Sequence, residues 1–109
     1  MTDESPGIAE IISGLNQYEQ RVLRLVGSYN ISQHKNIRKE TIKDRLPDKY
    51  GKKVDKAIDS LKSKGLLFPY RHKNYGLSSL GVLVAQELVK QFQNKKYKDL
   101  NKIMMVFHL

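Results

Sequence analysis

The chain has 109 residues, of which 39% are hydrophobic, enough for one domain with a core of its own. Twenty Lys and Arg residues against eleven Asp and Glu residues give a formal net charge of +9, which favours a polyanionic partner or a solubilising surface. The lack of cysteine excludes disulfides and thiolate zinc sites, and no apolar stretch approaches the roughly 20 residues of a membrane span, so we expect a cytoplasmic protein without a membrane partner.

Two helices are predicted in the first third of the chain. "GIAEIISGL", residues 7–15, follows Pro6 and is typical of a short helix with proline near its opening turn. "NQYEQRVLRLVGSY", residues 16–29, has apolar side chains at helical spacing and Asn16 as a plausible N-cap. The polar residues that follow predict a loop, ending in a very short strand near Asn36 to Arg38.

A short helix and a longer basic helix are predicted next. In residues 38–46, Ile42 and Leu46 are one helical turn apart, and the following proline ends the segment. Asp48 is predicted to cap a helix that includes Gly51 in its first turn, runs to about Lys64 and stops at Gly65. At 100° per residue this helix has an apolar side and a polar side. The apolar side holds Tyr50, Val54, Ala57, Ile58 and Leu61, and the polar side holds Lys49, Lys52, Lys56, Asp59, Ser60 and Ser63.

The rest of the chain predicts a hairpin and a closing helix. "LLFPYR" and "NYGLS" have strand composition and flank "HKN", a three-residue link, and Pro69 confines its strand to an edge. "SSLGVLVAQELVKQFQ", residues 78–93, is predicted helical with Ser78 or Ser79 as its cap. The side chains expected to face inward are Leu80, Leu83, Val84, Leu88 and Phe92.

The C-terminal segment, residues 93–109, has more apolar surface than a small domain needs. "DLNKIMMVFHL" places Leu100, Ile103, Met104 and Phe107 at helical spacing. The segment could pack on the first two helices or pair with a second copy, and we favour a homodimer.

This order of elements resembles the winged helix-turn-helix family of DNA-binding domains, including MarR-type and archaeal regulators. "AIDSLKSKGLL" is similar to the end of the family's recognition helix, and "NYGLSSLGVLVAQEL" to its second wing strand and closing helix. Tyr75, Leu77, Ser78 and Gly81 match the pattern Tyr-x-Leu-Ser/Thr-x-x-Gly. The resemblance covers about residues 17–92 of a single domain spanning residues 1–109. It implies a mainly α fold with a small β-hairpin wing, to which this chain adds N- and C-terminal helical segments.

By this resemblance, residues 39–46 would be the positioning helix, residues 49–64 the recognition helix and residues 68–77 a wing short enough to put deep minor-groove contact in doubt. A recognition helix turns its apolar face to the protein and its donors to phosphates and base edges. The DNA-binding candidates are Lys39, Lys43, Arg45, Lys49, Lys52, Lys53, Lys56, Ser60, Arg71, His72 and Lys73.

Charge is concentrated in the same part of the chain. Residues 34–75 hold thirteen basic and five acidic side chains, a net charge of +8, against −2 for residues 1–33 and +3 for residues 76–109. If the lysines of the basic helix stood by themselves, a solvated helix face would explain them. Their clustering with the basic residues of two neighbouring elements instead favours a phosphate-binding surface.

The basic helix predicts modest sequence specificity. Between residues 49 and 64 there is no Arg, Asn or Gln, the side chains that read guanine and adenine through two hydrogen bonds. Phosphate contacts should therefore dominate, and base discrimination would come from lysine on guanine, from Ser60 and Ser63, or from DNA shape.

No residues suggest catalysis, a cofactor or a metal site. His34, His72 and His108 are far apart in the chain, and the nucleotide-binding and nucleophile motifs are absent. Asp55 and Asp59 are expected to pair with Lys52, Lys56 or Lys62.

We therefore expect a non-enzymatic protein that binds double-stranded DNA and regulates transcription. Two alternatives remain open. One is an RNA- or ribosome-associated module, because charge does not distinguish the two kinds of duplex. The other is a protein-assembly module that binds an acidic partner.

Overall fold

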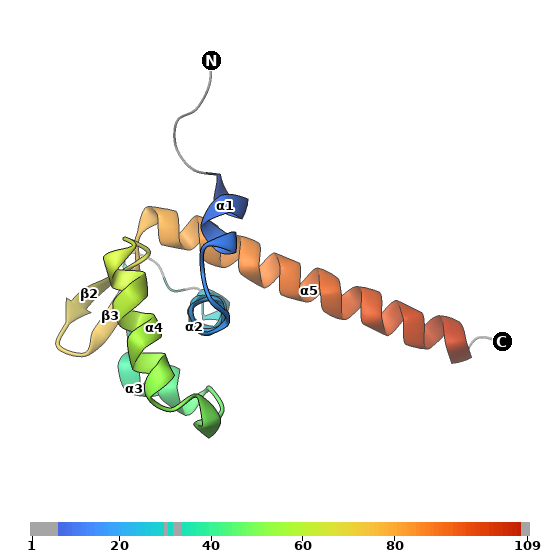
Figure 1. The fold of residues 1–109 in the computed structure, drawn as a ribbon, viewed down its shortest axis with the longest axis horizontal. Coiled ribbons are helices and arrows are strands. Elements are labelled where there is room, and N and C mark those ends of the chain that lie inside the picture. The colour runs from blue at the N-terminus through green and yellow to red at the C-terminus, as the bar shows by residue number, and fades with distance from the viewer. Residues whose placement is uncertain (1–6, 30, 32–33, 108–109) are drawn as a thin grey trace, which may run out of the picture.

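The fold is mainly helical with one small antiparallel sheet, which confirms the predicted class at this level (Figure 1). The computed structural model describes residues 7–29, 31 and 34–107, with the backbone alone at residues 101 and 103–107. In chain order the elements are α1 (Ile8–Ser13), α2 (Gln17–Ser28), β1 (Ile37–Arg38), α3 (Lys39–Asp44), the 3-10 helix η1 (Asp48–Tyr50), α4 (Lys52–Ser63), β2 (Leu67–Arg71), β3 (Asn74–Leu77) and α5 (Ser79–Phe107). Across these residues, no helix is long and apolar enough to cross a membrane.

Asn16 caps α2 as predicted. Its side-chain oxygen accepts hydrogen bonds from the backbone amides of Tyr18 and Glu19, at 2.9 and 2.8 Å. The Glu19 carboxylate accepts in return from the backbone amide of Asn16, at 3.0 Å. This capping box satisfies amides that have no partner inside the helix, and so fixes where α2 begins.

The helix predicted from Asp48 to Lys64 is divided into two at Gly51. Asp48–Tyr50 forms η1, and α4 begins at Lys52. The prediction that Gly51 continues the helix was wrong because its φ of 44° and ψ of −126° lie outside the right-handed helical region, in a conformation open mainly to glycine. Gly65, with a φ of 75°, follows the end of α4 as predicted.

The sheet has the strand order β1-β3-β2, so β3 is central and β2, with Pro69, is an edge strand as predicted. Asn74, which the sequence places both at the end of the link and at the start of the second strand segment, belongs to β3. Asn74 pairs with Arg38 of β1, and its side-chain amide donates to the Asn36 side chain at 2.8 Å. The turn therefore consists of His72 and Lys73.

The tip of the β2–β3 hairpin is joined to the start of α3. The backbone amide of Lys39 donates to the carbonyl of Lys73 at 2.9 Å, beyond the end of the β1–β3 pairing. The strand β1 is only two residues long, yet it fixes the hairpin beside the helical part of the chain.

The buried apolar side chains of the described residues form one cluster. The predicted apolar stripe of α4 is confirmed: Val54, Ala57, Ile58 and Leu61 are at most 3% exposed. Tyr50 packs at the edge of the cluster, with its ring edge-on to that of Tyr18.

The inward face predicted for α5 was right for Val84 and Leu88 and wrong for the other three side chains. Leu80, Leu83 and Phe92 are exposed. Small residues face inward instead, because α5 approaches the rest of the chain closely. A Cβ on Gly81 would overlap the Leu66 carbonyl, and Ala85 lies against α2.

The second half of α5 extends away from the other elements (Figure 1). Side chains 90–100 are all exposed, including Tyr97 at 65% and Leu100 at 52%. The described part of the C-terminal segment is therefore not buried against α1 and α2, the first of the two predicted arrangements.

Candidate nucleic-acid interface

The outer face of α4, opposite its buried stripe, consists of Lys52, Lys56, Asp59 and Ser63. All four side chains are exposed. Lys52 and Lys56 are one helical turn apart, and neither forms an ion pair with any described residue. Two ammonium groups are thus available to an external anion on this face.

Lys39 and Lys43 lie on one flank of α4, where both pair with Asp55. Their ammonium nitrogens are 2.9 and 3.3 Å from the two carboxylate oxygens. The prediction that Asp55 pairs within its own helix was wrong, because α3 presents two lysines one turn apart to this carboxylate. The hydrogen bond from the Lys39 ammonium lowers the pKa of Asp55 by more than partial burial raises it, and Lys43 lowers it further. In return, the Asp55 carboxylate raises the pKa of Lys39.

Lys53 and Ser60 lie on the other flank of α4 and face α2. The Lys53 ammonium donates to the Tyr18 hydroxyl at 2.9 Å. The half-buried Ser60 hydroxyl donates to Glu19 at 2.7 Å, next to the Lys64 ammonium on the same oxygen. Two predicted DNA-binding side chains therefore make contacts inside the protein, and Ser60 is not on the outer face where it was expected.

Lys49, from η1, is also exposed, and it does not line the hollow at the hairpin tip.

The tip of the hairpin carries the second group of cations. At the hairpin tip there is a hollow of about 360 Å³. It is lined by Arg38, Glu40, Arg71, His72, Lys73 and Asn74. Sequence reasoning missed Arg38, which reaches the tip only because β1 pairs with β3. Strand-like residues just before a basic helix were the available signal.

Arg45 lies apart from both groups. It lines a hollow between α2 and α5 together with Arg21 and Arg24, rather than joining the lysines of α4. The structure thus assembles the predicted site residues as one exposed pair on α4, one pair held by Asp55, and a cluster at the hairpin tip.

Such an arrangement provides hydrogen-bond donors and positive charge over an exposed surface. Among the described residues there is no group of three or more side chains that could hold a metal ion. Comparisons with protein-family models, with curated proteins and with solved structures found no match to this chain in any of the three.

Proposed function

We propose that this chain is a winged-helix domain that binds double-stranded DNA and acts in the regulation of transcription. The observation that carries the proposal is the pair of exposed lysines on the outer face of α4, Lys52 and Lys56, without an ion pair among the described residues. A helix whose opposite face is fully buried, and whose exposed face offers donors, meets the requirement for docking in a major groove.

The order of the elements supports the winged-helix part of the proposal. The succession α2, β1, α3, α4, β2 and β3, with β1 beside the hairpin, corresponds to the order of that family. In this interpretation α3 positions α4, α4 is the recognition helix, and the β2–β3 hairpin is the wing, with Arg71 and Lys73 reaching the flanking phosphates.

The composition of the outer face favours phosphate contact over the reading of bases. Lysine is a compact point charge that binds phosphates without selecting a base. Asp59, between the two lysines and Ser63, repels phosphate but can accept a hydrogen bond from cytosine. Modest sequence preference over strong electrostatic binding is the expected result.

The test is the salt dependence of binding. The double variant Lys52→Ala, Lys56→Ala should bind two unrelated duplexes of about 20 base pairs more weakly, and should lower the slope of log K against log salt by about two units. The matched control is Lys90→Ala, Lys98→Ala, which removes the same charge from exposed positions on α5. An unchanged slope in the α4 variant would refute the proposed interface.

Parallel titrations at one salt concentration separate the alternatives. The full chain is mixed with duplex DNA, with duplex RNA of the same sequence, and with polyglutamate. Tighter binding of duplex RNA would indicate the RNA-associated module, because the 2′-hydroxyl and the A-form groove distinguish the two duplexes. Binding of polyglutamate alone would indicate an assembly module with an acidic partner.

A further inference from the structure

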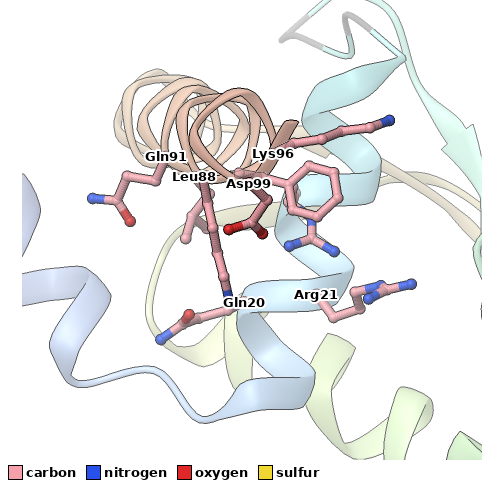
Figure 2. A pocket seen from close by; sticks show the side chains of 9 residues that line it. Gln20, Arg21, Leu88, Gln91, Lys96 and Asp99 are labelled. Carbon is pink, nitrogen blue, oxygen red and sulfur yellow. The ribbon is translucent and has the colours of Figure 1, made fainter. Parts of the chain in front are cut away.

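A basic groove runs between α2 and α5, on a surface that includes neither the outer face of α4 nor the hairpin. It consists of two hollows, of about 570 and about 380 Å³. Both hollows are lined by Arg24 and Phe92, and the Arg24 guanidinium lies 3.9 Å from the centre of the Phe92 ring. Figure 2 shows the first hollow, with Gln20 and Arg21 on the α2 side and Asp99 on the α5 side. We call this the α2/α5 groove.

Positive charge in the α2/α5 groove is not balanced by acids. Its cations are Arg21, Arg24, Arg45, Lys95 and Lys96, and Asp99 is the acid among the residues that line the two hollows. None of the five cations forms an ion pair with a described residue. Like charges gathered in a hollow repel one another, and a bound anion would relieve that repulsion.

The arginines are suited to an oxygen-rich anion such as a phosphate. Three of the five arginines in the chain line this groove, whereas α4 has none. A guanidinium presents a rigid fork of donors that fits two oxygens of one phosphate, and stacking on Phe92 holds Arg24 in place. Partial burial lowers the pKa of Arg24, and the neighbouring positive charge of Arg21 lowers it further.

The strong positive charge of the groove favours nucleic acid over an acidic protein. Protein interfaces have an apolar centre depleted of lysine, whereas nucleic-acid interfaces are polar and strongly positive. Five cations against one acid line the two hollows, together with the amides of Gln20, Gln91 and Gln93 and the apolar side chains Leu25, Leu46, Leu88, Val89 and Phe92.

We propose that the α2/α5 groove is a second nucleic-acid surface, which holds the phosphate backbone of duplex DNA. The phosphates can come from the flank of the duplex bound by α4 or from a second duplex. The inference goes beyond the proposed α4 interface, because it rests on other residues and stands if α4 proves not to bind DNA.

The main test neutralises three exposed side chains of the groove in the full chain. The variant Arg45→Gln, Lys95→Gln, Lys96→Gln should lower the slope of log K against log salt for a duplex of about 30 base pairs by two to three units, at about 0.9 per phosphate contact. The control Lys35→Gln, Lys90→Gln, Lys98→Gln removes the same charge from exposed residues that line neither hollow. Equal slopes for the two variants would overturn the proposal, as would a groove variant that weakens polyglutamate binding and leaves duplex binding intact.

A gain of affinity provides a second measurement that loss of folding cannot imitate. Asp99→Asn removes the acid from the groove and should tighten duplex binding about threefold, because it removes the repulsion between one exposed carboxylate and the phosphates. Glu10→Gln, an exposed acid on α1, makes the same charge change and should leave affinity unaltered. No tightening by Asp99→Asn beyond that control would count against phosphates in the groove.

Stoichiometry and a combined variant separate the sources of phosphate and the two proposals. Two duplexes per protomer in sedimentation, reduced to one by the groove variant, indicate a second duplex, whereas one duplex bound more weakly indicates flanking contacts. The groove substitutions are also made in the Lys52→Ala, Lys56→Ala background. A groove effect that persists where the α4 substitutions alone change nothing would refute the α4 interface and keep the groove. The reverse pattern would refute the groove and keep the α4 interface.

Discussion

Glu19 joins the first turn of α2 to the C-terminal end of α4. It is 3% exposed, and its two oxygens accept from the Asn16 amide, the Ser60 hydroxyl and the Lys64 ammonium. Burial acts to raise the pKa of Glu19, but these hydrogen bonds together outweigh burial, so the pKa is lowered. A buried carboxylate satisfied in this way links α2 to the C-terminal end of α4.

Replacing Glu19 with glutamine should lower the free energy of unfolding at pH 7 by about 2 kcal/mol, because charge-assisted bonds are lost in a buried site. A carboxylate with a lowered pKa stabilises the fold above its unfolded-state pKa, and that contribution disappears as pH falls through the folded-state value. The gap between wild type and Glu19→Gln should therefore narrow between pH 7 and pH 3. Urea unfolding at both pH values measures it. Glu10→Gln, on the surface of α1, should show no gap at either, and a pH-independent gap for Glu19→Gln would contradict the ionic account.

At this scale the sequence predicts contacts that are local and misses those that are not. The Asn16 cap follows from residues within one helical turn. The partners Ser60 and Lys64 are 41 and 45 residues from Glu19, and nothing near any of the three marks the bond. Asp55 was assigned to lysines of its own helix for the same reason, because the spacing of α3 against α4 is a property of the packing.

Among the elements, the start of α4 depends on one backbone conformation. Gly51 takes φ 44° and ψ −126° between η1 and α4, so the chain turns there rather than continuing as one helix. The conformation of Gly51 therefore sets the direction of the α4 axis, and with it the direction in which Lys52 and Lys56 point.

Gly51→Ala should lower the free energy of unfolding by about 1–3 kcal/mol, since a side chain in this region of φ and ψ is strained. Gly14→Ala is the matched control, because Gly14 has a φ of −84° and its added Cβ would make ordinary contacts. Thermal unfolding followed by circular dichroism compares the two. Equal losses would show that the conformation at residue 51 is not what limits the substitution.

Hydrophobic periodicity predicts these elements well and their rotation less well. The stripe of α4 is unambiguous, because its other side is charged. In the first half of α5, apolar residues lie on most sides of the helix. Their spacing therefore does not indicate whether Leu80 and Leu83 or the small residues Gly81 and Ala85 face the core. The choice is made by how closely α5 approaches α2 and the Leu66 carbonyl, which only the folded chain determines.

For the whole molecule, the extended second half of α5 favours association with a second copy. Tyr97 and Leu100 are exposed on it, and the sequence continues with Ile103, Met104 and Phe107 at helical spacing. We propose that this segment pairs two chains, which would suit a palindromic DNA site.

Sedimentation of the full chain at tens of micromolar should therefore give a dimer. A chain that ends at Lys98 should be a folded monomer, because Asp99, Leu100 and Lys102, the removed residues whose side chains the structure describes, are exposed. A monomeric full-length chain would contradict the proposal. Unfolding of the shortened chain would instead indicate that the segment packs within its own protomer.

The α2/α5 groove is the feature least accessible from the sequence. Its cations come from α2, from the end of α3 and from the middle of α5, and the basic residues of α2 belong to the part of the chain with net negative charge. A charge profile along the chain therefore places the positive excess in residues 34–75 and does not detect it.

The backbone hydrogen bond from Lys39 to Lys73 should affect how fast a ligand associates with this surface. With β1 paired to β3, the start of α3 and the tip of the hairpin keep a fixed separation before any ligand arrives. A ligand that touches both would meet a preorganised frame, which would reduce the loss of backbone entropy on binding. Encounter should then be limited by diffusion and electrostatic steering, with differences in affinity expressed mainly in the rate of dissociation.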